Sequence, residues 1–256
     1  MTVGYGVVML GAAWARSLSP GPRWRATVGS LALMGLAWYA PLAPPLVRSW
    51  LPMAFIGLGY FLSGQLFNAP MTGLEAWLIG VDRRWFGDPT ERFAGWPAWL
   101  VGYLDIVYTL TFLLLPAGGL AVMSLGRPEL LERYWAVLVA AEFGSFVTLA
   151  VIQTRPPWAL ERAAHVSADR VHALSAYFVQ HGTIRANTFP SGHTAGTLAI
   201  ALVLLGAWPM MGGVFLALSL SVAVACVVGR YHYAVDVILG AALAVTVWGA
   251  ALAAGL

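Results

Sequence analysis

Lysine is missing from this 256-residue sequence, and cysteine occurs only once. All fourteen basic residues are therefore arginine, and charged residues make up only 10% of the chain. A soluble domain carries about 25% charged residues, so these few charges cannot cover a water-facing surface of this size. The single Cys226 excludes an intrachain disulfide and argues against a cysteine-rich metal site. The net charge of +3 is too small and too scattered to indicate nucleic-acid binding.

Long apolar segments fill the sequence instead, since 60% of the residues are hydrophobic. A helix needs about 20 apolar residues to cross a bilayer, and backbone polar groups cannot be left unpaired in lipid. The sequence therefore predicts an all-α, polytopic membrane helix bundle, and a multi-pass protein of a bacterial plasma membrane. We expect seven or eight spanning helices, depending on the short first segment, near residues 2–15, 27–47, 50–67, 98–123, 134–152, 192–208, 210–229 and 232–254.

Two polar segments interrupt this pattern. The first, residues 68–97, mixes Leu, Trp and Phe with paired arginines, which predicts an interfacial helix lying along the membrane surface. The second, residues 153–190, begins near Pro156 and Pro157, which we expect to end the preceding helix. Within it, "SADRVHALSAYFVQ" (167–180) has helical spacing. A connection of this length between spans, rich in aromatic residues, indicates an ordered loop or lid.

His232 and Asp236 lie four residues apart at the start of the last predicted span. In a helix this spacing places both side chains on one face. A carboxylate there can hold one imidazole nitrogen protonated and raise the basicity of the other, which suits a histidine nucleophile or base. The alternative is a pair that only satisfies two polar groups inside a bundle.

The stretch "FPSGH" precedes another apolar run. Ser191 is placed to cap a helix, and Gly192 permits close approach of another backbone. The amides of a first helical turn form an anion site, and His193 on that turn would face the same anion. The alternative is a capped helix with an incidental histidine.

Three arginines flank these motifs at predicted membrane boundaries: Arg155, Arg185 and Arg230. Singly, each fits a side chain that snorkels to the interface. Together with two histidines and an aspartate they describe a phosphate pocket, in which guanidinium groups neutralise the phosphoryl oxygens. Because arginines carry out this charge neutralisation, we expect neither a metal nor another cofactor.

The motifs "RPP" (155–157), "PSGH" (190–193) and "RYHYAVD" (230–236) resemble those of the type 2 phosphatidic acid phosphatase superfamily. "DRRWFGDPT" (82–90) and "RYHYAVDVILG" (230–240) are more similar to its branch of inositol phosphorylceramide and sphingomyelin synthases. The resemblance implies a six-helix phosphatase core.

The same resemblance implies domain limits and residue roles. The core would occupy residues 50–256, and residues 1–49 would add one or two N-terminal spans. His232 would be the nucleophile that forms a phosphohistidine, Asp236 its orienting partner and His193 the general acid. The implied phosphate ligands are Arg155, Ser191 and Gly192.

Two positions depart from the family pattern. Thr148 stands where the pattern has a lysine, and Cys226 where it has an arginine. We expect Arg230 and Arg185 to supply the missing charge.

The predicted substrate is a lipid phosphate or phospholipid drawn from the bilayer, and the sequence assigns no oligomeric state. Water as acceptor would make the protein a phosphatase, and an alcohol would make it a phosphotransferase. A polyprenyl diphosphate phosphatase is an alternative. A non-enzymatic transporter or scaffold for anionic lipids is another, although binding alone needs no nucleophile with an orienting carboxylate. Asp105 and Glu142 lie inside predicted spans, where each could bind a headgroup or a neighbouring helix.

Overall fold

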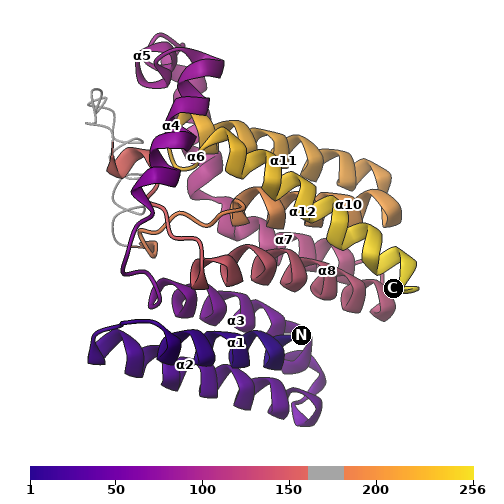
Figure 1. Cartoon of the computed structure of the whole chain (residues 1–256). Helices are drawn as coiled ribbons and strands as arrows, with labels where there is room; N and C mark the ends of the chain where they lie inside the picture. The colour runs from indigo at the N-terminus through magenta and orange to yellow at the C-terminus, as the bar shows by residue number, and fades with distance from the viewer. Residues whose placement is uncertain (161–181) are drawn as a thin grey trace.

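The computed structural model describes residues 1–160 and 182–256, and these residues form an all-α bundle (Figure 1), which confirms the predicted fold class. Within them there is no β-strand, only an isolated antiparallel bridge between Thr154 and Asn187. The helices are α1 (Thr2–Ala15), α2 (Pro20–Tyr39), η1 (Ala40–Leu42), α3 (Pro45–Gly64), α4 (Thr72–Phe86), α5 (Pro89–Ala94), α6 (Ala98–Thr109), α7 (Thr111–Met123), α8 (Pro128–Val147), η2 (Thr148–Ala150), η3 (Pro157–Ala159), α10 (Gly192–Ala207), α11 (Pro209–Val228) and α12 (Ala234–Ala253).

Proline begins several of these helices. Pro20 and Pro45 occupy the first position of α2 and α3. A proline there sacrifices no hydrogen bond, and its fixed φ suits the helix. Both helices consequently begin several residues before 27 and 50, where the hydropathy of the sequence predicts the spans to start.

The helices form two groups in Figure 1, with α1–α3 along one side of a bundle that contains α7, α8 and α10–α12. Helix α10 packs against α8, α11 and α12, and is therefore central. The first group joins the second directly, because Tyr5 of α1 stacks on Phe143 of α8 with ring centroids 4.1 Å apart. The Tyr5 hydroxyl also donates to the Gly59 carbonyl at 2.8 Å. One continuous hydrophobic core thus links both groups.

The predicted span 98–123 is not one straight helix. It consists of α6 and α7, which meet at a 62° bend. Near the bend, the Thr109 hydroxyl donates to the Asp105 carbonyl at 2.8 Å, and the Thr111 hydroxyl donates to the Val107 carbonyl at 3.1 Å. Such back-bonding by threonine often bends helices.

Fewer helices qualify as spans than the seven or eight predicted. Among the described residues, α3, α11 and α12 are long and apolar enough to cross a membrane, with a fourth span if α6 and α7 count as one. Helices α1 and α10 have only 14 and 16 residues. At about 1.5 Å per residue these two fall short of a bilayer core about 30 Å thick. Charged residues interrupt the 20-residue helices α2 and α8.

The segment 68–97 forms two helices, α4 and α5, instead of the single interfacial helix predicted. Gly87, with φ 76°, follows α4, and Asp88 caps α5 by accepting from the backbone N–H of Thr90 at 2.9 Å. In Figure 1, α4 runs steeply across the direction of the bundle helices, and it contacts α12.

The predicted lid at 153–190 is described only at its two ends. The helical stretch predicted over 167–180 lies outside the described residues. The ends themselves meet, because the Asn187 N–H donates to the Thr154 carbonyl at 2.9 Å.

Candidate active site

His232 lies in the turn between α11 and α12. This corrects the expectation that it begins the last helix, since α12 starts at Ala234 and the His232 N–H donates to the Cys226 carbonyl at 2.9 Å. The imidazole still meets the predicted carboxylate: His232 Nδ1 is 3.4 Å from Asp236 Oδ2. That contact leaves Nε2 as the nitrogen available for chemistry.

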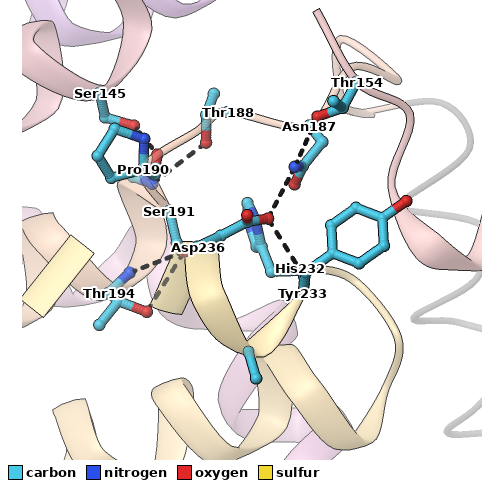
Figure 2. A network of polar contacts seen from close by, with 12 residues as sticks. Ser145, Thr154, Asn187, Thr188, Pro190, Ser191, Thr194, His232, Tyr233 and Asp236 are labelled. Atoms are coloured by element: carbon cyan, nitrogen blue, oxygen red, sulfur yellow. Dashed lines mark hydrogen bonds and ion pairs between the residues drawn. The ribbon is translucent and has the colours of Figure 1, made fainter. Parts of the chain in front are cut away.

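Asp236 is fully buried at the third position of α12 and gathers a network of polar contacts (Figure 2). Its Oδ2 accepts from Asn187 Nδ2 at 2.7 Å and from the Tyr233 N–H at 3.2 Å. Asn187 Nδ2 also donates to Thr154 Oγ1 at 3.0 Å. The Asp236 carboxylate is therefore held by Asn187, which Thr154 at the other end of the 153–190 segment holds in turn.

The start of α10 is built as the sequence predicted. Ser191 is its N-cap, and its hydroxyl accepts from the Thr194 N–H at 3.4 Å. The Ser191 N–H donates to the Asp236 carbonyl at 3.0 Å, which ties α10 to α12. Gly192 makes a close approach, because a Cβ there would lie 3.1 Å from the Ser145 hydroxyl.

His193 lies in the first turn of α10, within an aromatic surround. It stacks on Tyr108 with centroids 4.9 Å apart, and meets the edge of Phe112 at 5.4 Å. The bend between α6 and α7 lies between these two aromatic residues. The His193 and His232 rings are 5.6 Å apart, and His193 Nε2 is buried without a hydrogen-bond partner in the described part of the chain. The fold therefore brings together the two histidines that the sequence analysis singled out.

A cavity, here called the catalytic cavity, brings both histidines together with one predicted arginine. Its cavity volume is about 30 Å³, and it is partly open to solvent. Its lining consists of Tyr60, Tyr108, Pro156, Trp158, Thr183, Arg185, Ala186, Thr188, His193, Tyr231 and His232.

The structure pairs Arg155 with a carboxylate that the sequence analysis missed. Arg155 Nε and Nη2 donate to the two oxygens of Glu75 at 3.1 and 2.7 Å, and its N–H donates to Glu75 Oε1 at 2.8 Å. Burial raises the pKa of the Glu75 carboxyl, but these hydrogen bonds outweigh burial and hold the pKa below its usual value. Arg155 is not among the residues that line the catalytic cavity, although the next residue, Pro156, is.

Arg230 is likewise engaged by a carboxylate. Its Nη1 donates to Asp82 Oδ2 at 2.8 Å, and both side chains are buried. Asp82 Oδ1 also accepts from the Ala234 N–H at 3.0 Å, which fixes the start of α12 directly behind His232. Arg230 is absent from the cavity lining, so of the three predicted arginines Arg185 alone lines it.

Thr148 and Cys226, the two positions that depart from the family pattern, each form hydrogen bonds within the protein. The Thr148 hydroxyl donates to the Ser145 carbonyl at 2.6 Å. Cys226 is fully buried, and its carbonyl accepts from the N–H groups of Tyr231 and His232 at 3.0 and 2.9 Å. Cys226 thereby shapes the turn that carries His232.

Glu75, Asp82 and Asn187 were not predicted as parts of the site. Their partners are 80, 148 and 49 residues away in the chain, so no local spacing reveals them. Of these three residues, only Asp82 could have been found from the sequence, because it begins the "DRRWFGDPT" stretch that resembles a family motif. Among the described residues, no three His, Cys, Asp or Glu side chains are grouped as metal ligands.

An all-α bundle with several apolar spans places the chain among multi-pass helical membrane proteins. The family model of the PAP2 superfamily matches residues 76–250, more than half of the chain, and the chain belongs to that superfamily. This confirms the resemblance to type 2 phosphatidic acid phosphatases and supports a phosphatase-type activity on phosphate esters. No curated protein and no solved structure matches the chain.

Proposed function

We propose that the protein cleaves a lipid-linked phosphate ester through a phosphohistidine on His232. The observation that carries this proposal is the convergence of His232 and His193, with centroids 5.6 Å apart, on one cavity. His232 is oriented through Nδ1 by Asp236, so Nε2 is the attacking atom.

In the first step, His232 Nε2 attacks phosphorus. The P–N bond forms as the ester P–O bond breaks, and His193 gives its proton to the leaving oxygen. In the second step, the oxygen of water or of an alcohol attacks phosphorus. The P–N bond breaks, its electron pair returns to Nε2, and His193 takes up the proton.

The charge of the site suits this chemistry. Burial lowers the pKa of His232 to about 3, so its imidazole is neutral and nucleophilic at neutral pH. Burial lowers the pKa of His193 in the same way, so His193 gains the proton that it donates when the anionic phosphate binds beside it. Arg185 lines the cavity, and the first-turn amides of α10 add a positive helix end.

We assign direct phosphate binding to Arg185. Ser191 and Gly192 hold the positive end of α10 in place, because the Ser191 N–H donates to the Asp236 carbonyl and the Gly192 N–H donates to Thr188. Arg155 and Arg230 position the site through their ion pairs with Glu75 and Asp82.

The lipid nature of the substrate is supported by the apolar helices around the site and by aromatic lining residues such as Trp158. We place the protein in the synthase-like branch on its "RYHYAVD" motif. We also propose that residues 50–256 form the enzymatic core, to which the helices of residues 1–49 are an addition.

Phosphate release from phosphatidic acid and from a polyprenyl diphosphate in detergent micelles tests the proposal. We expect His232→Ala to reduce release by at least about 10³-fold, because the nucleophile is lost. Wild-type protein quenched in alkaline SDS, in which the P–N bond is stable, should carry ³²P from labelled substrate, and the variant should carry none. The control is Thr246→Val, an exposed position on α12, which should match the wild type.

Full turnover by a folded His232→Ala protein would contradict the proposal. Binding of these lipids without turnover by the wild type would move the protein to the class of transporters and scaffolds. A preference for the diphosphate would favour the polyprenyl diphosphate phosphatase reading.

A further inference from the structure

A second cavity lies beside the catalytic cavity, between α3, α7, α8 and α10. It is small, with a cavity volume of about 20 Å³, room for one hydroxyl-sized group, and we call it the Glu142 cavity. Tyr60, Thr188 and His193 line both cavities, so His193 stands between them. A group bound in the second cavity would therefore adjoin the reacting phosphoryl group on the side of the general acid.

Glu142 supplies the acidic side chain of this second cavity. It lies inside α8 and is only 6% exposed, yet it forms no hydrogen bond or ion pair with any residue in the described ranges. A buried polar group without a partner costs about 1–3 kcal/mol, and more when charged, so such groups in native proteins call for an explanation. The proposed reaction as described above does not use this carboxyl.

Two glycines of α10 make room for the carboxyl. A Cβ at Gly196 would lie 2.0 Å from Glu142 Oε1, and a Cβ at Gly192 would lie 3.2 Å from Oε2. Glu142 is thus seated against the first turn of α10, on which His193 lies. Its position is compatible with contact to a ligand that also reaches His193.

The neighbouring hydroxyls indicate the chemistry of that ligand. Thr111 donates to the Val107 carbonyl at 3.1 Å and retains acceptor capacity toward the cavity. Thr188 accepts from the Gly192 N–H at 3.2 Å, which leaves its proton able to be donated. A site with both donors and acceptors matches hydroxyl groups, whereas an ammonium group could only donate.

We propose that the Glu142 cavity binds a polyol, with one hydroxyl at His193 and a second hydroxyl donating to Glu142. This inference rests on the proposed function. The polyol enters as acceptor: its first hydroxyl oxygen forms a bond to phosphorus, the P–N bond to His232 breaks, and the proton passes to His193. The reverse step releases the same polyol from a phosphate ester. Glu142 is then the residue that distinguishes polyols from simple alcohols and water.

The test compares glycerol with 1-propanol, which has the same carbon chain and a single hydroxyl. Protein in detergent micelles receives ³²P-labelled phosphatidic acid with either alcohol, and the labelled phosphate, glycerol phosphate and propyl phosphate are quantified. We expect the wild type to favour transfer to glycerol by about tenfold, the value of one hydrogen bond to the Glu142 carboxyl. Glu142→Ala should abolish this preference, and Glu142→Gln, which keeps an acceptor oxygen, should retain part of it.

A second arm separates the acceptor from the leaving group. Hydrolysis of glycerol 3-phosphate should exceed that of propyl phosphate in the wild type if the leaving polyol uses the cavity, and Glu142→Gln should reduce the difference. Glu132→Gln is the matched control, because Glu132 is exposed on the same helix. It should keep both selectivities.

The outcomes distinguish the two proposals. Phosphate release without any preference for glycerol in either arm would overturn the polyol site and leave the proposed function standing. Selectivity unchanged in Glu142→Gln and Glu142→Ala would also overturn it. An absence of phosphate release and of ³²P-labelling in the wild type would instead refute the proposed function.

Discussion

At the scale of single residues, the candidate site depends on carboxylates that hold arginines in place. Asp82 is fully buried and bonds both Arg230 and the N–H of Ala234. Arg230 has a φ of 57°, a conformation that is uncommon for a residue with a side chain. The ion pair therefore fixes a strained turn immediately before His232.

Replacing Asp82 by Asn tests this role. The amide oxygen can still accept from Ala234, but the charge that balances the buried Arg230 is lost. We expect the free energy of unfolding to fall by about 3–5 kcal/mol, measured by SDS titration in mixed micelles. Glu129→Gln, which breaks an exposed pair with Arg127, should change nothing measurable. Equal losses in both variants would contradict a special role for the buried pair.

The sequence predicted those residues whose signal is local. The Ser191 cap is an example, since residue type and position predict it and the structure contains it. Glu75 and Asn187 could not be found in this way, because their bonds to Arg155 and Asp236 exist only after distant segments meet.

At the scale of helices, the site requires α10 and α12 to approach closely. Gly240 of α12 faces the start of α10, and a Cβ there would lie 2.6 Å from the Ser191 carbonyl oxygen. Gly249, on the same helix, has no atom within 4 Å of such a Cβ. The two glycines therefore form a matched pair for substitution.

Gly240→Ala should destabilise the protein by about 1–3 kcal/mol, because the backbone of α10 must move to admit the methyl group. Gly249→Ala should be neutral or stabilising by up to about 1 kcal/mol, since alanine favours the helix. SDS titration measures both, and phosphate release should fall only in Gly240→Ala, where Ser191 and His193 are displaced. A destabilised Gly249→Ala with an unaffected Gly240→Ala would contradict this packing.

Hydropathy predicted that residues 98–123 are helical, but it did not predict that they form two helices with a bend between them. The segment 98–123 has the hydropathy of one span, and hydropathy gives no signal for its 62° bend. Two threonine hydroxyls donate to helix carbonyls near the bend, a contact that often bends helices. Tyr231 packs against α6 beside the bend: its ring stacks on Tyr108 with centroids 3.7 Å apart, and its hydroxyl donates to Asp105 at 3.3 Å. Of the two alternatives for Asp105, a headgroup or a neighbouring element, the structure contains the second, because Asp105 bonds Tyr231. Glu142 has no such partner among the described residues.

At the scale of the whole molecule, buried groups with shifted pKa values link stability to pH. His232 titrates at about 6.5 in an unfolded chain, whereas burial lowers its pKa to about 3 in the folded protein. Below pH ~6.5 the unfolded chain binds a proton at His232 that the folded protein does not bind, so the free energy of unfolding falls as the pH falls. The pKa of Glu75, held below its usual value, acts in the same direction, but only under more acidic conditions.

Between pH 6.5 and 5, Glu75 does not titrate, and His232 should cost about 1 kcal/mol per pH unit. Burial lowers the pKa of His193 as well, so His193 adds to the slope in the wild type and in His232 variants alike. We expect the apparent melting temperature of the wild type in detergent to fall over this range at constant ionic strength. His232→Gln, which cannot titrate, should start lower at pH 7 and fall less steeply, so that the two curves converge in acid. Parallel curves would show that His232 is protonated equally in the folded and unfolded states. That result would also remove the neutral nucleophile on which the proposed mechanism depends, because the same burial determines both its stability linkage and its reactivity.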